Sequence, residues 1–256
     1  PPVPGIDLEG VITSTEALSL KAPPKSIAVL GGGVIGLEFA SLFSSLGASV
    51  AVVEMLPEIL PTMDAEIAGI LRGALARRGV SFHLGSRISE VARSGGDLVV
   101  RVETPSGPTT LRAEKLLVAA GRRPVSEGLG LERIGVATER GRIKVDSRMR
   151  TGVEGVYAVG DCASRIMLAH VASREGEVAA ENIMGAPVVM DYKTVPSVVY
   201  TSPEAASAGL SEDEARRSGL SVRVGRFPMS ANGRSLIANQ GDGMVKYVVD
   251  EKYGEI

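Results

Sequence analysis

The sequence predicts an α/β fold in which a Rossmann-like domain with a parallel sheet is followed by two further segments. Between residues 26 and 85, short apolar runs alternate with longer amphipathic stretches. A glycine-rich turn joins the first run to the first amphipathic stretch, and hydrophobic residues make up 44% of the chain, a globular value. Strands that alternate with helices pair in parallel through right-handed crossovers, so this order predicts a βαβαβ core.

The first strand and the first helix are expected on either side of the glycine-rich turn. SIAVLG at residues 26–31 is a short apolar run that ends in glycine, which is the pattern of a buried strand. VIGLEFASLFSSLG at residues 34–47 predicts a helix that Gly47 ends. The apolar residues that recur in it at helical spacing are Ile35, Phe39, Leu42, Phe43 and Leu46.

The core continues with a second helix between two more strands. SVAVVE at residues 49–54 and VSFHLG at residues 80–85 read as strands, and Asp64 can cap the helix between them. The apolar face of that helix consists of Ile67, Ile70, Leu71 and Leu75. Residues 97–120 predict an antiparallel excursion followed by another buried strand.

The character of the chain changes after GRRP at residues 121–124. A loop-rich stretch leads through RIKVD and GVYAVGDC, a strand-like run, to an expected helix of about 15 residues near 170–184. A third region begins at Tyr192, where VPSVVYTSP, VRVGRFPM and GMVKYVVD read as strands. Ser211 and Glu214 form a capping box, which predicts that a helix starts there.

Composition narrows the classes of function. The net charge is −2, from 28 basic and 30 acidic residues, so nothing favours nucleic acid or a membrane surface as a partner. A single cysteine cannot form an intramolecular disulfide, which fits a reducing compartment such as the cytoplasm or, in a eukaryote, the mitochondrial matrix. The chain begins at PPVPGIDLEG without methionine or a secretory signal and ends at KYGEI inside an apparent strand, so we expect a piece of a longer protein.

The glycine-rich turn predicts a dinucleotide site. GGGVIG at residues 31–36 fits the G-x-G-x-x-G pattern between a strand and a helix. In this pattern Gly31 permits the tight turn, Gly33 lets a pyrophosphate approach the backbone, and Gly36 lets the helix pack closely on the strand. The helix N-terminus then offers N–H groups and the positive end of its dipole to the phosphates.

Glu54 indicates which dinucleotide binds. It stands at the end of the next strand, where a carboxylate can accept hydrogen bonds from both ribose hydroxyls. The same charge would repel a 2′-phosphate, and MLPEILP after it contains no arginine. NAD is therefore favoured over NADP, while an FAD version of the same fingerprint stays open from these residues.

Several motifs in one order resemble a known family. They are GGGVIGLE, the acid at Glu54, ILPTMD, AAGRRP, GVYAVGDC, MLAH and VPSVVYTSPE. Together they are similar to the flavoprotein disulfide reductases, and most closely to the dihydrolipoyl dehydrogenases, from about residue 5 to the end of the chain. The resemblance implies an FAD-domain edge or linker over residues 1–25, an NAD domain over 26–121, a second FAD segment over 122–192, and the start of a dimerisation domain over 193–256.

The resemblance also implies site residues for both cofactors. Those expected around NAD are Gly31, Gly32, Gly33, Val34, Ile35, Gly36, Glu38, Glu54, Ile88 and Gly121. Those expected around FAD are Gly160, Asp161, Met167, Leu168, Ala169 and His170. Asp161 would accept hydrogen bonds from the ribityl chain of the flavin, and residues 167–170 would lie along the flavin at a helix N-terminus.

The remaining candidate side chains are given structural interpretations. Cys162 has no partner cysteine and is read as a packing residue, while His83 in its strand-like run is read as structural. The sequence contains no paired histidines, C-x-x-C or H-E-x-x-H, so no metal site is predicted.

The resemblance further implies what the intact enzyme contains. The family carries a first FAD fingerprint and a C-x-x-x-x-C disulfide near its N-terminus and a His–Glu pair near its C-terminus, none of which occurs in this sequence. We therefore expect no catalytic residue in this chain, no activity of this chain alone and no retained flavin. The intact enzyme would be a homodimer, with a 2-oxoacid dehydrogenase or glycine cleavage complex as partner.

Two alternatives stay open at this level. One is another member of the superfamily, such as a mercuric, glutathione or trypanothione reductase or a soluble transhydrogenase; several of these use NADPH and would favour arginine near position 54. The other is a non-catalytic NAD-binding module that senses the nucleotide ratio, which the absent disulfide favours.

Overall fold

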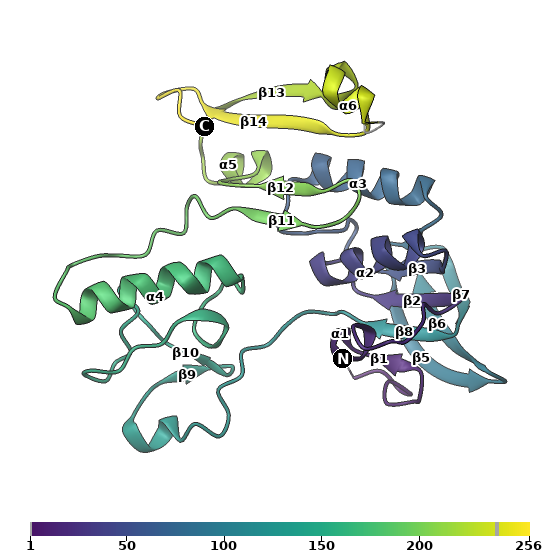
Figure 1. The fold of residues 1–256 in the computed structure, drawn as a ribbon, viewed down its shortest axis with the longest axis horizontal. Coiled ribbons are helices and arrows are strands. Elements are labelled where there is room, and N and C mark those ends of the chain that lie inside the picture. The colour runs from purple at the N-terminus through teal and green to yellow at the C-terminus, as the bar shows by residue number, and fades with distance from the viewer. Residues whose placement is uncertain (1, 239–240) are drawn as a thin grey trace. The chain divides into compact units, whose positions relative to one another are not determined.

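The computed structural model describes residues 2–238 and 241–256 and divides the chain into two compact units (Figure 1). Unit 1 contains Pro1–Gly121 and Pro196–Ile256, and unit 2 contains Arg122–Val195. Each unit has its own apolar clusters and is described by itself.

The centre of unit 1 is a parallel sheet of five strands in the order β1-β8-β2-β3-β4, and its parallel pairing is the one that the alternating pattern predicts. Its strands are β1 (Val11–Ile12), β2 (Ser26–Leu30), β3 (Ser49–Val53), β4 (Ser81–His83) and β8 (Lys115–Val118). Helix α2 (Val34–Ser45) connects β2 to β3, and helix α3 (Ala65–Arg77) connects β3 to β4. Asp64 caps α3 by accepting the N–H groups of Glu66 and Ile67, as expected.

The N-terminal stretch contributes to the same sheet. The short helix α1 (Ser14–Ala17) carries a capping box between Thr13 and Glu16. Strand β1 lies before it and pairs in parallel with β8, with Val11 opposite Leu116. Part of the stretch expected as a linker or an edge of the FAD domain therefore forms the edge strand of this parallel sheet.

Helix α2 buries a different face from the one that its leucines suggest. Gly36, Leu37, Ala40 and Phe43 are buried, whereas Leu42 and Leu46, which share the helical spacing of the buried Phe43, are 47% and 54% exposed. Because the glycine lets the helix axis approach the sheet, the buried arc is centred on positions 36, 40 and 43. Leu42 and Leu46 then point to solvent, and Gly47 ends the helix with φ +86°.

An antiparallel sheet covers one face of the parallel sheet. Its strands β6 (Asp97–Thr104) and β7 (Gly107–Ala113) confirm the predicted excursion, and β5 (Arg87–Ser94), which the sequence did not predict, pairs with β6. Apolar residues of β5 and β6 pack with Ala28, Leu30 and Val53 of the parallel sheet. Residues of α2 and α3 pack in a second cluster with Ile27, Val29 and Val52 of the same strands. Strand β2, which ends at the glycine turn, and strand β3 are thus buried on both faces.

The C-terminal part of unit 1 consists of two hairpins and two short helices. Its elements are β11 (Ser197–Val199), β12 (Ala205–Ser207), α5 (Glu212–Arg217), β13 (Val222–Pro228), the 3₁₀ turn η3 (Met229–Ala231), α6 (Gly233–Ile237) and β14 (Met244–Asp250). The capping box of Ser211 and Glu214 starts α5 as predicted. Val199 and Ala205 join the apolar cluster that contains α2 and α3.

Unit 2 has less regular structure. It consists of the 3₁₀ turns η1 (Leu131–Ile134) and η2 (Gly160–Cys162), the strands β9 (Thr138–Glu139) and β10 (Arg142–Ile143), and helix α4 (Ala169–Ile183). The 15 residues of α4 confirm the helix expected near 170–184.

The strand-like run before Asp161 does not form a strand. Its one ladder contact is an isolated bridge between Tyr157 and Arg150. Its side chains nevertheless alternate, because Tyr157 and Val159 pack in the cluster of α4 whereas Ala158 packs in a different cluster. The run has the side-chain period of a strand, but no strand in the described part of unit 2 pairs with it along its length.

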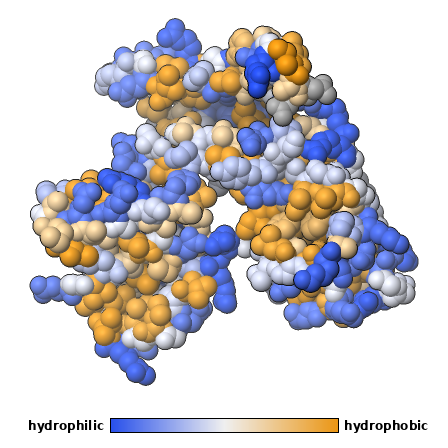
Figure 2. Space-filling view, in the orientation of Figure 1, coloured by the Kyte–Doolittle hydropathy of each residue, from blue (hydrophilic) through white to orange (hydrophobic). Residues whose placement is uncertain are grey.

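Apolar side chains also lie on the surface of both units (Figure 2). Those of unit 2 include Val125, Leu129, Ile134, Ile183 and Met184. Among the described residues, none of the helices is both long and apolar enough to cross a membrane.

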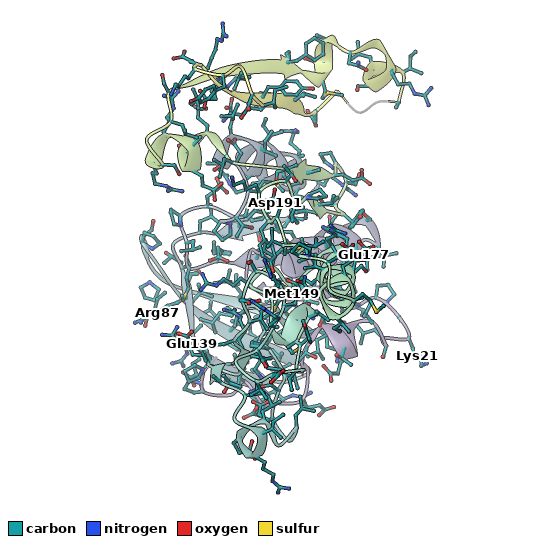
Figure 3. The ribbon with its side chains drawn as sticks, turned by 90° about the vertical axis from the view of Figure 1, so that its left-hand side faces the viewer. Lys21, Arg87, Glu139, Met149, Glu177 and Asp191 are labelled. Carbon is teal, nitrogen blue, oxygen red and sulfur yellow. The ribbon has the colours of Figure 1, made fainter. Side chains whose placement is uncertain are left out.

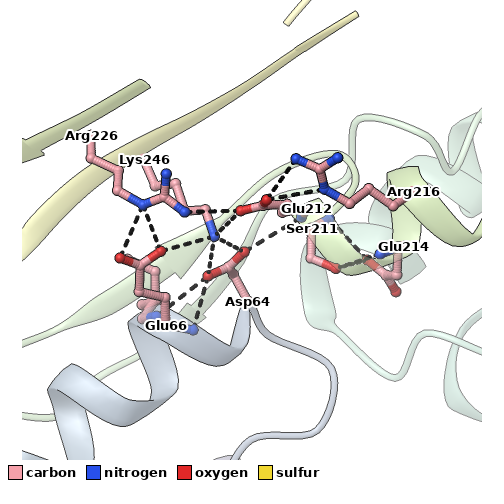
Figure 4. Close-up of polar contacts among 9 residues, drawn as sticks. Asp64, Glu66, Ser211, Glu212, Glu214, Arg216, Arg226 and Lys246 are labelled. Atoms are coloured by element: carbon pink, nitrogen blue, oxygen red, sulfur yellow. Dashed lines mark hydrogen bonds and ion pairs between the residues drawn. The ribbon is translucent and has the colours of Figure 1, made fainter. Parts of the chain in front are cut away.

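A buried lysine connects the elements of unit 1 (Figure 4). The Lys246 side chain, from β14, is 7% exposed, and its Nζ lies 2.8 Å from Asp64 Oδ2, 2.9 Å from Glu212 Oε2 and 3.2 Å from Glu66 Oε2. Arg226 of β13 contacts Glu66 at 2.8 Å and Glu212 at 3.0 Å. One ammonium group thus holds α3, α5 and β14 together.

This cluster shifts the pKa values of its members. Burial opposes ionisation of Asp64, but the hydrogen bond and charge of Lys246 outweigh it and hold the pKa of Asp64 below its ordinary value. Burial likewise opposes protonation of Lys246, and its three carboxylate partners raise its pKa overall. A carboxylate with a lowered folded pKa stabilises the fold above its unfolded pKa, and that stabilisation is lost as the pH falls through the folded value.

Lys246→Met should destabilise unit 1 by about 3 kcal/mol, because three carboxylates lose their shared cation. Urea unfolding followed by circular dichroism measures this. The free energy of unfolding of the parent chain should also fall as the pH drops below about 4, and less steeply in the variant.

Arg93→Met is the matched control, because Arg93 forms a 2.6 Å ion pair with Glu9 at an exposed site. Its loss should cost less than about 1 kcal/mol. Equal losses of unfolding free energy in the two variants would show that the buried cluster stabilises the fold no more than an exposed ion pair does.

Candidate functional site

The glycine turn after β2 allows atoms to approach more closely than any side chain would permit. Gly31 has φ +113°, and a Cβ there would lie 2.5 Å from the carbonyl oxygen of Ala119. A Cβ on Gly36 would lie 2.0 Å from the carbonyl oxygen of Gly31. Both distances are far below contact, so these two positions require glycine, for the reasons that the sequence pattern gives.

Gly33 faces open space instead. It is the N-cap of α2, its φ is −79°, and nothing lies within 4 Å of the position that a Cβ would occupy. No described side chain caps this helix, whose ladder begins when Leu37 N–H donates to the Gly33 carbonyl at 3.0 Å. The N–H groups of the first turn therefore precede the helical ladder and point to the helix start, next to this open position.

Glu54 lies directly beside the turn. Its Oε2 accepts the N–H of Gly32 at 2.6 Å, and its Oε1 accepts the N–H of Leu56 at 2.8 Å. The side chain is half-buried, so its remaining lone pairs can accept two hydroxyl groups. The two backbone bonds fix the carboxylate at the carboxyl end of β3, where its negative charge disfavours a phosphate.

The other residues expected around NAD are placed in different surroundings. Val34 and Ile35 are half-buried at the start of α2, and the half-buried carboxylate of Glu38 accepts the N–H of Tyr200 at 2.9 Å. Ile88 is only 6% exposed and packs in the apolar cluster of β5 and β6. Gly121 is exposed with φ +115° beyond the end of β8.

The sheet topology brings Gly33, Glu54 and Gly121 to one end of the parallel sheet. Strand β2 lies between β3, which carries Glu54 at its carboxyl end, and β8, which leads to Gly121. All three strands are parallel, so their carboxyl ends meet there. The chain moves from β2 to β3 on one side and to β8 on the other, which makes this end the topological switch point where ligands of such sheets bind.

Unit 2 holds the residues expected around FAD. Asp161 lies in η2, is 39% exposed, and its Oδ2 accepts a hydrogen bond from Arg122 Nη2 at 2.5 Å. Leu168 is the N-cap of α4, and no described side chain caps that helix. Ala169 and His170 are exposed in the first turn of α4, and Met167 is half-buried just before it.

A hollow of about 760 Å³ borders η2. It is lined by Ala163, Ser164 and Tyr192, among others, and by Arg142 of β10. The Nε of Arg142 is buried and has no hydrogen-bond partner among the described residues. The residues around the hollow thus include apolar and charged side chains, and one of them, Arg142, keeps a buried donor without a partner among the described residues.

Glu175 is a residue that sequence reasoning missed. It is 1% exposed on α4, and its carboxylate accepts the N–H of Gly160 at 2.7 Å and the hydroxyl of Tyr192 at 2.7 Å. Burial and the bond to Glu175 raise the pKa of Tyr192. Its place between Val171 and Val178 on the buried face of α4 is the signal that could have revealed it.

The cysteine and the histidines take no part in a metal cluster. Cys162 is half-buried, and its Sγ donates to the Val159 carbonyl at 3.3 Å. His83 is half-buried at the end of β4. Within the described ranges, no group of three or more His, Cys, Asp or Glu residues is arranged to hold a metal ion.

The sheet, the glycine turn and Glu54 define a dinucleotide-binding protein of the Rossmann class. The family model for pyridine nucleotide-disulphide oxidoreductases matches residues 1–176, and the model for the dimerisation domain of that family matches residues 195–256. The chain belongs to the pyridine nucleotide-disulphide oxidoreductase family. The family uses FAD and a pyridine nucleotide as cofactors.

Curated relatives carry a more specific name. Dihydrolipoyl dehydrogenase from Thermus scotoductus is 46% identical over 94% of this chain and 53% of its own length. The enzyme of the same name from Bacillus subtilis is 40% identical over 99% of this chain and 55% of its own length. The chain therefore spans about half the length of the curated relatives that it matches.

A solved structure supports the fold. The HOCl-induced flavoprotein disulfide reductase RclA from Escherichia coli, in its Cu(II) complex, superposes with a TM-score of 0.90 at 32% identity. The match covers 98% of this chain and 58% of that chain.

Gly33→Ala should leave the fold intact and lower the affinity for NADH by about tenfold or more, because the methyl group would stand where a pyrophosphate must approach. Calorimetric titration of NADH measures the affinity, and the unfolding free energy should change by less than about 1 kcal/mol. Gly36→Ala should lose both stability and binding, because its Cβ has no room.

Gly73→Ala is the control for these two variants. Gly73 lies inside α3, where a Cβ would meet only Arg77 Nη1 at 3.5 Å. This variant should bind NADH normally and gain up to about 1 kcal/mol of stability. An unchanged affinity of Gly33→Ala for NADH would show that the glycine turn does not take part in binding the nucleotide.

Glu175→Ala should destabilise unit 2 by about 2 kcal/mol and loosen the η2 turn, because the Gly160 N–H and the Tyr192 hydroxyl lose their acceptor. Hydrogen exchange of residues 160–162 should become faster. Glu177→Ala is the control, since Glu177 lies on the same helix with a 62% exposed side chain (Figure 3). Equal exchange in the two variants would exclude the proposed role of Glu175 in holding this turn.

Proposed function

We propose that this chain carries the NAD site and part of the FAD site of a dihydrolipoyl dehydrogenase. The intact enzyme would oxidise dihydrolipoamide to lipoamide and reduce NAD to NADH. The observation that carries the proposal is the carboxylate of Glu54 beside the glycine turn, in a chain whose curated relatives are named dihydrolipoyl dehydrogenase. A carboxylate at this place accepts ribose hydroxyls and disfavours the 2′-phosphate of NADP.

The residues of unit 1 fit a bound NAD. Gly33 leaves room for the pyrophosphate, and the N–H groups at the start of α2 supply its hydrogen bonds. Glu54 holds the adenosine ribose, and its bond to the Gly32 N–H keeps it in place for that task. Glu38, held by the Tyr200 N–H, lies further along α2, towards the nicotinamide end in this proposal.

The residues of unit 2 fit part of a flavin site. FAD, when bound, supplies the electron transfer between a dithiol and NAD. Asp161 is exposed enough to accept hydroxyls of a ribityl chain while it keeps its bond to Arg122. The uncapped start of α4 offers N–H groups to an electron-rich edge of the flavin ring. Glu175 orients the backbone that carries Asp161.

Association and location follow from the same proposal. The match to the dimerisation domain supports a homodimer of the intact enzyme. A 2-oxoacid dehydrogenase or glycine cleavage complex is the partner that a dihydrolipoyl dehydrogenase serves. A cytoplasmic location, or the mitochondrial matrix in a eukaryote, belongs to this proposal as well.

A second candidate is a disulfide reductase with a different substrate. The similarity to RclA, which is named a flavoprotein disulfide reductase, favours it. The two candidates differ in the disulfide that the intact enzyme reduces and in the nucleotide that it prefers.

Activity assays of the intact protein with NADH and NADPH distinguish these two candidates. Lipoamide reduction with NADH, at a rate well above that with NADPH, is the result expected. Reduction of glutathione disulfide or mercuric ion with NADPH, without lipoamide activity, would reject the proposal and favour the second candidate.

The chain itself should bind NADH about tenfold or more tightly than NADPH, and Glu54→Gln should remove most of that preference, because the repulsion of the 2′-phosphate is lost. Calorimetric titration of both nucleotides measures it. Glu58→Gln is the control, since Glu58 is nearby in sequence but pairs with Arg72 at 2.8 Å. A preference that persists in Glu54→Gln would show that other groups select the nucleotide.

A further inference from the structure

A second charged group, Arg87, follows a loop that is hydrogen-bonded to the backbone of Glu54. Two backbone bonds join the loop after β3 to the loop before β5, since Ser86 N–H donates to the Glu54 carbonyl at 2.8 Å and Gly85 N–H donates to the Leu56 carbonyl at 2.9 Å. A hollow of about 430 Å³ opens there, and Met55, Arg87 and Glu103 are among the residues that line it. Met55, which lines this hollow, directly follows Glu54, the residue proposed to bind the ribose.

Arg87 brings the one positive charge to this hollow. It is the only basic side chain among the described residues that line it. Its Nε lies 2.6 Å from Glu103 Oε2, and the two residues are opposite each other on β5 and β6. Both side chains are exposed, and Arg87 lies at the outer edge of the ribbon in Figure 3. The guanidinium group is therefore accessible to a ligand but is already paired.

We propose that Glu103 is a residue that determines nucleotide specificity, because it neutralises Arg87 and so withholds a counter-charge from a 2′-phosphate. Arginine is the side chain best suited to bind a phosphate with two hydrogen bonds. An unpaired Arg87 in the hollow next to the loop of Glu54 would offset part of the repulsion from Glu54. The Arg87–Glu103 pair keeps this end of the site selective for the nucleotide without that phosphate.

This inference rests on the proposed role of Glu54 in binding NAD. The role proposed for Glu103 predicts a different result from the role of Glu54, because Glu103 acts through Arg87 and does not contact the ribose. Loss of Glu103 should therefore improve the binding of NADPH and leave the binding of NADH as it is. A surface ion pair without function would alter neither.

The test is calorimetric titration of NADH and NADPH into the parent chain and Glu103→Gln. NADPH should bind about fivefold more tightly to the variant, with a change of less than twofold for NADH. Adding Arg87→Ala to Glu103→Gln should return NADPH binding to the parent value. The gain should also shrink in high salt, because the freed charge is exposed.

Glu90→Gln is the matched control. Glu90 pairs with Arg101 at 2.9 Å on the same two strands, and neither residue lines the hollow. It changes the net charge equally and should leave both affinities unchanged. An equal NADPH gain in this control, or no gain in Glu103→Gln, would overturn the role of Glu103. Failure of the parent chain to bind NADH would instead reject the proposed function.

Discussion

The close approach of α2 to the turn after β2 is the constraint on which the proposed nucleotide site depends. Gly36 brings the first turn of the helix against the carbonyl oxygen of Gly31, at a distance that leaves no room for a Cβ. Gly31 in turn lies against the backbone after β8. Because these backbones meet directly, the start of α2 is held over the carboxyl ends of three strands. The N–H groups of the helix, the open position at Gly33 and the carboxylate of Glu54 then converge on one place.

Much of this arrangement could be predicted from the sequence, because it is encoded by local rules. Glycines between a strand and a helix, and an acid at the end of the next strand, have few structural solutions. The capping residues Asp64 and Ser211 also act within one turn of chain, and both act as expected. The leucines of α2 show what periodicity leaves undetermined. Leu42 and Leu46 share the helical spacing of the buried Phe39 and Phe43 but are exposed, because the orientation of the helix follows from its packing at Gly36.

The pairing of distant strands and the burial of charged side chains could not be predicted from local sequence patterns. The run before Asp161 has the alternation of a strand, yet a strand also requires a neighbour, which periodicity alone does not supply. Glu175 looks like any helical acid until the fold buries it against Gly160 and Tyr192. Lys246 meets Asp64 across 182 residues. These contacts depend on tertiary structure, so the sequence gives only weak hints of them, such as an acid on an apolar helical face.

The end of the parallel sheet that carries Gly33 and Glu54 is the proposed NAD site, and a crystal structure of this chain grown with NAD would show whether the nucleotide binds there. We expect both hydroxyls of the adenosine ribose at about 2.6–3.2 Å from the Glu54 carboxylate, with the pyrophosphate against the N–H groups at the start of α2. A nucleotide bound elsewhere in unit 1, or one whose ribose lies away from Glu54, would overturn the proposed site.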